Sequence, residues 1–168
     1  LADTRATMPL VELAEKSENR YLRLRSVNVL GSIKDAHATE PLLKLLDDSM
    51  NGEQLRGAAA VSLGAIGDTE AMSPLHELLL DGRNSVQLRE RVAYGLGLLG
   101  NRGSIGTLTR VLENTADQDL IISIVGALGK IGDSSALPTL QQVEKKYPTG
   151  LVNRATVKAR NAIVRRPR

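Results

Sequence analysis

The sequence contains no cysteine, phenylalanine or tryptophan, and its only aromatic residues are Tyr21, Tyr94 and Tyr147. The absence of cysteine excludes a disulfide framework, a thiolate nucleophile and zinc sites built from thiolates. Because aromatic side chains are so scarce, Leu, Ile, Val and Ala must fill the core, which suits helices that pack closely and repetitively. No apolar run approaches the roughly 20 residues that a membrane-spanning helix needs, so we expect no membrane partner.

Signals for strands and for targeting are also missing. The sequence has no strand pattern, no Gly-rich loop after a strand and no visible signal peptide. A cysteine-free chain is stable in either redox environment, so the compartment stays undetermined. Cytoplasmic is the default, and a periplasmic or secreted location is also compatible. Because residue 1 is Leu1 rather than methionine, we expect a piece of something longer.

Charge is distributed unevenly along the 168 residues, although the net charge is only +3. Residues 1–144 carry 14 basic and 19 acidic side chains, whereas residues 145–168 carry eight basic side chains and no acidic one. Apolar residues make up 42% of the chain, which is enough to bury a core. The composition therefore predicts a folded, mildly acidic body that ends in a basic segment.

A nine-residue pattern recurs four times, as VNVLGSIKD (27–35), AVSLGAIGD (60–68), AYGLGLLGN (93–101) and VGALGKIGD (125–133). The glycines of the Leu-Gly pairs are 33, 33 and 32 residues apart. Self-similarity at a fixed period of this length is typical of a repeat architecture. Seven residues before each motif leucine stands a further column, which consists of Arg23, Arg56, Arg89 and Ile121.

Each period contains two stretches with the apolar spacing of a helix. We expect the first helices at 20–33, 53–66, 86–99, 118–131 and 151–164, and the second helices at 8–16, 39–47, 72–80, 105–113 and 137–146. This pattern predicts an all-α solenoid of antiparallel helix pairs, with about 32–33 residues per repeat. We expect a single domain over 1–168, divided into a partial repeat (1–18), repeats at about 19–51, 52–84, 85–116 and 117–149, and a degenerate terminal helix (150–168).

Glycines and arginines recur at fixed places for reasons that we expect to be structural. Glycine follows the first helix in three repeats, where a left-handed cap favours it, and Lys34 replaces it in the fourth at a cost of about 1 kcal/mol. A second glycine column (31, 64, 97 and 129) lies inside the first helices, where glycine costs roughly 0.8–1 kcal/mol relative to alanine. This column predicts the close approach of a neighbouring helix, and the arginine column predicts bonds to loop acids or helix ends.

The motif from Arg56 to Asp68, Arg-x6-Leu-Gly-x-Ile-Gly-Asp, resembles the short HEAT-like repeat of the phycobilisome-lyase type. The resemblance covers nearly the whole chain. It implies a right-handed superhelix, with the first helices on the convex side and the second helices on the concave side. It implies little about function, because such repeats serve many proteins. The array begins in mid-repeat, so we expect a monomer or a fragment of a longer array.

Two columns of the second helices lie between the expected core positions. The first column is partly apolar, as in a binding groove, and the second alternates in charge. That alternation predicts either a ladder of ion pairs between repeats or contacts with a partner. If these helices line a concave groove, its floor consists of the first column (Val11, Leu43, His76, Thr109 and Gln141) and the second column (Glu12, Lys44, Glu77, Arg110 and Gln142).

No catalytic constellation is apparent. The histidines are His37 and His76, and the serines lack the context of a nucleophile. The related deoxyhypusine hydroxylases hold two irons with several His-Glu pairs, whereas this chain has the single pair His76-Glu77. The acids at 47, 48, 117 and 119 are expected to cap helices. We therefore expect no enzyme, no metal and no cofactor, with an accessory role to a lyase left open.

The leading interpretation is a non-catalytic protein–protein interaction scaffold that binds a partner protein in the groove. One alternative, which the resemblance implies, is a chaperone-like bilin-lyase subunit, although cysteine is absent and aromatics are few. The other alternative is nucleic-acid binding through the basic C-terminal segment. Against it, aromatic stacking platforms are nearly absent. Nucleic acid or an acidic partner would contact Lys145, Lys146, Arg154, Lys158 and Arg165.

Overall fold

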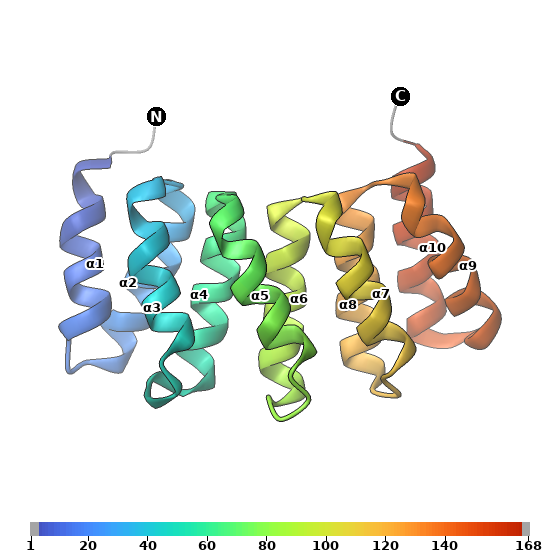
Figure 1. The fold of residues 1–168 in the computed structure, drawn as a ribbon, viewed down its shortest axis with the longest axis horizontal. Helices are drawn as coiled ribbons and strands as arrows, with labels where there is room; N and C mark the ends of the chain where they lie inside the picture. The colour runs from blue at the N-terminus through green and yellow to red at the C-terminus, as the bar shows by residue number, and fades with distance from the viewer. Residues whose placement is uncertain (1–3, 166–168) are drawn as a thin grey trace.

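The computed structural model describes residues 4–165, which form an all-α solenoid of helices arranged in two layers (Figure 1). No strand occurs within this range. The odd-numbered helices form one layer: α1 (Thr7–Lys16), α3 (Thr39–Asp47), α5 (Met72–Leu80), α7 (Ile105–Glu113) and α9 (Leu137–Lys146). The even-numbered helices form the other: α2 (Arg20–Ile33), α4 (Gly52–Ile66), α6 (Val86–Leu99), α8 (Gln118–Ile131) and α10 (Gly150–Val164).

The observed helix bounds differ from the predicted ranges by one residue at most. The even-numbered helices are the predicted first helices, and the odd-numbered helices are the predicted second helices. Two basic residues of the C-terminal segment, Arg166 and Arg168, lie outside the described residues, as do the outermost ends of the predicted domain. Among the helices of residues 4–165, none is both long and apolar enough to cross a membrane.

Local sequence explains where the helices end. Gly67, Gly100 and Gly132 adopt the left-handed conformation directly after α4, α6 and α8, as predicted. Lys34 takes the same conformation after α2, with a φ of 59°. An Asp or Asn follows each of these caps and accepts a hydrogen bond from the backbone N–H two residues on, which begins a short 3-10 turn. These four residues are Asp35, Asp68, Asn101 and Asp133.

The interior glycines let neighbouring even-numbered helices meet at backbone distance. A Cβ placed on Gly64 would collide with the backbone carbonyl of Gly95 in α6. A Cβ on Gly31 would lie 2.8 Å from the Cα of Ser62, and one on Gly129 would lie 2.8 Å from the Cβ of Ala159. Both separations are shorter than a van der Waals contact. The predicted close approach is therefore confirmed, and it explains why the sequence tolerates glycine inside these helices.

The arginine column ties each odd-numbered helix to the even-numbered helix that follows it. The Nε–H of Arg23 donates to the carbonyl of Ala14, that of Arg56 to Leu46 and that of Arg89 to Leu79, over 2.8–2.9 Å. These carbonyls lie in the last turn of α1, α3 and α5, where intrahelical partners run out. The prediction of bonds to helix ends is confirmed, and these bonds fix the three guanidinium groups between the helices.

The spacing of the two layers corrects the expectation that the odd-numbered helices line a concave floor. Even-numbered helices touch through glycine, whereas α3 and α5 leave a hollow between them. Figure 1 likewise shows the odd-numbered helices fanned out in front of the more closely spaced even-numbered helices. Helices of a curved stack crowd together on its inner side. The even-numbered layer is therefore the inner one, and the predicted columns lie in the more open, outer layer.

Candidate functional site

A hollow with a volume of about 850 Å³ lies between α3 and α5 on the odd-numbered layer. Its apolar lining comes from leucines of both helices and from Pro74 in the first turn of α5. Leu46 is fully buried, Leu43 and Leu78 are half-buried, and Leu80 is 40% exposed. We call this hollow the α3–α5 groove; its residues are Glu40, Leu43, Lys44, Leu46, Asp47, Pro74, Glu77, Leu78, Leu80, Asp81 and Arg83.

Both basic side chains of the α3–α5 groove are engaged by acids of their own segment. Lys44 lies 2.9 Å from Glu40, one helical turn earlier, and this pairing raises the pKa of Lys44 and lowers that of Glu40. Arg83 lies 2.8 Å from Asp81, and its hydrogen bonds lower the pKa of Asp81 to about 2. The rim of the groove therefore contains two ion pairs, and each of its two cations already has an acidic partner.

The remaining groove acids give it a negative balance. Within residues 4–165, Asp47 takes part in no ion pair, and Glu77 only accepts a 3.4 Å hydrogen bond from the hydroxyl of Ser73. Both side chains belong to exposed residues. A ligand that fits this groove would combine an apolar surface with one or two positive charges.

The predicted ladder of ion pairs between repeats is not formed. Within the described part of the chain, no ion pair joins Glu12, Lys44, Glu77 and Arg110 to one another. Instead, Lys16 pairs with Glu12 at 3.3 Å within α1, and Lys44 pairs within α3. Partners four residues apart on one helix are closer than partners on the fanned-out neighbouring helix. The expectation of a ladder was wrong, because Glu12 and Lys44 pair within their own helices.

Several residues of the predicted floor hold repeats together instead. His76 Nε2 lies 3.0 Å from the hydroxyl of the buried Ser104, and partial burial lowers the pKa of His76. The hydroxyls of Thr109 and Thr139 are 3.3 Å apart. Val11 is 5% exposed and belongs to the core. These contacts lie between successive repeats, so these side chains have a packing role.

The eight predicted floor residues on α3, α5, α7 and α9 are the predicted partner contacts, and the structure does not bring them together. Leu43, Lys44 and Glu77 line the α3–α5 groove. Gln142 lines a smaller hollow of about 190 Å³ with Val143, Leu112 and Tyr147. His76 and Thr109 make the contacts between repeats just described. The exposed residues Arg110 and Gln141 line neither hollow.

The predicted basic contacts also divide into two sets. Arg154, Lys158 and Arg165 line one shallow hollow on α10. Lys145 and Lys146 are exposed in the last turn of α9, where the ammonium of Lys146 lies 5.4 Å from the centre of the Tyr147 ring. The hollow on α10 thus includes three of the five residues.

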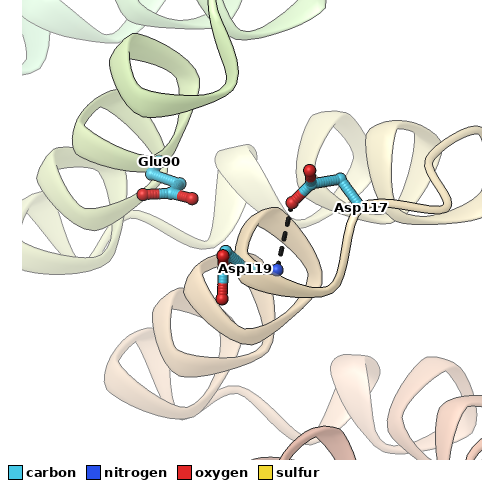
Figure 2. Close-up of side chains that lie close together, drawn as sticks. All are labelled: Glu90, Asp117 and Asp119. Carbon is cyan, nitrogen blue, oxygen red and sulfur yellow. Dashed lines mark hydrogen bonds between the residues drawn. The ribbon is translucent and has the colours of Figure 1, made fainter.

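Three carboxylates meet between α6 and the start of α8, as Figure 2 shows. One oxygen atom from each of Glu90, Asp117 and Asp119 lies within 4.8 Å of the others. Burial, followed by repulsion from Asp119 and Asp117, raises the pKa of Glu90. Hard cations such as Mg²⁺ and Ca²⁺ take carboxylate oxygens, so these are the described residues best placed to hold a metal.

Helix capping accounts for most of this acidic cluster without a metal. Asp117 is the N-cap of α8 and accepts hydrogen bonds from the backbone N–H groups of Asp119 and Leu120, both at 3.0 Å. Asp119 lies in the first turn of α8, where a negative charge favours the helix dipole. Capping by Asp117 was predicted, whereas the approach of Glu90 was not, because it depends on how α6 packs beside α8.

Sequence reasoning missed several groove residues. Asp47, Leu78, Leu80 and Arg83 line the α3–α5 groove but belong to neither predicted column. The columns follow one stripe along each helix, whereas the crevice between two helices is lined by facing stripes and by the loop after α5. The signal available in the sequence was the apolar run 74–80, which continues past the residues needed for the core.

A family model described as HEAT repeats matches the chain twice, over residues 7–87 and 82–159. These matches cover most of the chain. No curated protein matches it. The fold and the repeat pattern thus have a common explanation in one family, while no curated relative provides a function.

Two solved structures share features with the chain. The first is described as the complex of CpcE and CpcF of phycocyanin lyase from Nostoc sp. PCC7120, with a TM-score of 0.76 and 23% identity. The match covers 96% of this chain, which spans only 66% of the length of that chain. The second is human deoxyhypusine hydroxylase in complex with glycerol, with a TM-score of 0.47, 18% identity, and coverage of 96% and 90%. At these identities the first likeness concerns the fold alone, and the second is too weak to support a conclusion.

Proposed function

Because the chain belongs to the HEAT-repeat family, we propose that it is a non-catalytic scaffold that binds a partner protein in the α3–α5 groove. The observation that carries the proposal is the apolar floor of this groove between charged rims. A well-packed core contact surrounded by polar residues is the usual anatomy of a protein interface. The proposed contacts are Leu43, Leu78 and Leu80 on the floor, with Asp47 and Glu77 on the rim.

The electrostatics of the groove support a partner segment that carries basic residues beside apolar ones. Lys44 and Arg83 already have acidic partners at 2.9 and 2.8 Å, whereas Asp47 and Glu77 have no basic partner within residues 4–165. An amphipathic helix with a Lys or Arg next to its apolar face meets both requirements. The matched chain with a TM-score of 0.76 was solved in a complex of two proteins, which is consistent with a protein partner.

The chemistry of the described side chains supports a binding role over a catalytic one. His76 is held by Ser104, and the Glu90 cluster includes an acid that already caps a helix. Among residues 4–165, the hydroxyl of Ser104 is hydrogen-bonded to His76, but Ser104 is completely buried and no acid is hydrogen-bonded to His76, so the pair lacks the access and the orienting group that acyl transfer needs. An accessory role in which this chain presents a protein substrate to an enzyme is a form of the same proposal.

Reversing the unpaired groove acids tests the proposal. The double variant Asp47→Lys with Glu77→Lys should no longer recover the partner protein from a lysate treated with nuclease. Because both side chains are exposed, the two substitutions should leave the fold intact. Glu18→Lys with Glu70→Lys makes the same charge change at exposed positions outside the groove. Recovered proteins are quantified by mass spectrometry. Equal recovery of the same proteins by the two variants would exclude the groove as the binding site.

A further inference from the structure

We use the term outer face of α10 for the face opposite its contact with α8. It corresponds to the face on which α4, α6 and α8 contact the next even-numbered helix. In each of α4, α6 and α8, one residue contacts the preceding even-numbered helix, and a glycine two residues later contacts the following even-numbered helix. In α10, Ala159 contacts the preceding even-numbered helix, so the residue that corresponds to these glycines is Asn161. Four residues before it, Val157 is half-buried, whereas its equivalents Val27, Ala60, Ala93 and Val125 are completely buried.

Three positions around this face carry basic residues, whereas the corresponding positions of the other repeats do not. Arg154 stands where the other even-numbered helices have Leu24, Gly57, Glu90 and Ile122. Lys158 stands where they have Asn28, Val61, Tyr94 and Gly126. Arg165 replaces the turn residues Asp35, Asp68, Asn101 and Asp133. The repeat itself requires none of these charges, because the corresponding positions of the other helices carry apolar, polar or acidic residues.

Among residues 4–165, these three cations have no acidic partner. Arg154, Lys158 and Arg165 are exposed, and within residues 4–165 none of them takes part in an ion pair. Arg160, on the other side of the same helix, lies 2.7 Å from Glu144 and is thereby neutralised. Together with Asn153, Val157, Asn161 and Ala162, the three cations line a shallow hollow of about 570 Å³.

The dimensions of this face match a helix. Arg154 and Arg165 are 11 residues apart in sequence, which corresponds to about 16 Å along the axis of α10. Val157 and Ala162 form an apolar centre between the charges. The lining contains no aromatic side chain on which a nucleic-acid base could stack. A protein helix with an apolar stripe and acidic flanks complements this arrangement of groups.

We infer that the outer face of α10 docks an acidic amphipathic helix of a partner protein, at the place where the other repeats receive their next even-numbered helix. Asn161 in place of glycine keeps this helix further away than α6 lies from α4. The extra space allows the long side chains of Arg154, Lys158 and Arg165 to reach carboxylates. This docking face lies at the α10 end of the array, away from the α3–α5 groove, and does not depend on it.

The test measures binding of a fluorescent peptide by anisotropy. The probe is a designed amphipathic helix of about 20 residues, with leucines on one stripe and glutamates on both flanks. A reference peptide has the same composition in an order without a stripe. We expect the designed peptide to bind the chain, and Arg154→Glu with Lys158→Glu to weaken binding by about tenfold or more. The matched variant Lys145→Glu with Lys146→Glu, which changes the charge equally on α9, should bind as the parent does.

Several results would overturn the inference. These are the absence of peptide binding, equal binding of the reference peptide, and equal weakening by the two charge reversals, which would indicate attraction by net charge only. Displacement of the peptide by a DNA duplex that binds more tightly would assign the face to nucleic acid instead. Far-UV circular dichroism monitors folding, and Arg154→Gln with Lys158→Gln, which removes charge without reversing it, should show a weaker loss of the same kind.

Discussion

The contact between Gly64 and α6 predicts that the smallest possible side-chain addition destabilises the array. A Cβ on Gly64 would collide with the backbone carbonyl of Gly95, so α4 and α6 must separate along their length. Overpacking of this kind costs about 1–3 kcal/mol, and the upper part of that range, about 2–3 kcal/mol, applies here because the obstacle is backbone rather than a flexible side-chain end. Replacing an interior glycine by alanine returns roughly 0.8–1 kcal/mol of helix propensity. We therefore expect Gly64→Ala to lower stability by about 1–2 kcal/mol.

Gly126 provides a matched control two repeats further along the chain. It also lies inside an even-numbered helix, α8, but a Cβ there would meet no atom within 4 Å. Gly126→Ala should therefore gain the propensity term alone and raise the melting temperature by about 2–4 °C. Gly64→Ala should lower the melting temperature by about 2–8 °C. The assay is thermal denaturation followed by far-UV circular dichroism. A Gly64→Ala variant as stable as Gly126→Ala would refute the reasoning from close packing.

Three further predictions concern caps and hydrogen bonds. Lys34→Gly should stabilise the chain by about 1 kcal/mol in urea denaturation, because the residue holds a φ of 59°; an unchanged midpoint would contradict this. Arg56→Met removes a 2.8 Å bond to the end of α3 and should cost about 1.5–3 kcal/mol, whereas Arg102→Met, at an exposed site, should change stability by less than about 0.5 kcal/mol. The hydroxyl of Thr7, 2.6 Å from Asp35, is the main reason that the pKa of Asp35 falls from 3.8 to about 2. Ionised Asp35 thus favours the fold above about pH 4, and this contribution is lost as the pH falls toward 2; Thr7→Val should make acid unfolding less steep in that range, and an unchanged pH profile would be the contrary result.

Residues that repeat with the period were predictable from the sequence, because the same environment recurs four times. The glycines inside the even-numbered helices and the arginines of the 23–56–89 column are examples. Ile121 stands in place of the arginine after α7. The end of this helix has a different hydrogen bond, in which the side-chain amide of Asn114 donates to the carbonyl of Arg110 at 2.7 Å. The isoleucine is instead 1% exposed in the core.

Features that depend on how neighbouring helices are spaced could not be predicted in the same way. The charge alternation from Glu12 to Arg110 suggests a ladder only if the odd-numbered helices lie close together, and the hollow beside Lys44 shows that α3 and α5 do not. The period also does not say which layer is the inner one. Which layer is the inner one depends on the distance between neighbouring helices within each layer, and this distance is set by whether glycine or leucine lies at their contacts. The approach of Glu90 to Asp117 is likewise a property of the packing of α6 beside α8.

The proposal that the α3–α5 groove binds a protein is tested most directly by a photo-crosslinking amino acid at position 43. Leu43 is half-buried in the groove, and Ser32, exposed on the even-numbered layer, provides the control position. The account predicts a discrete protein adduct from position 43 that survives nuclease, is absent from position 32, and disappears when Asp47 and Glu77 are changed to lysine. Adducts of equal yield from both positions, or an adduct from position 32 alone, would contradict it.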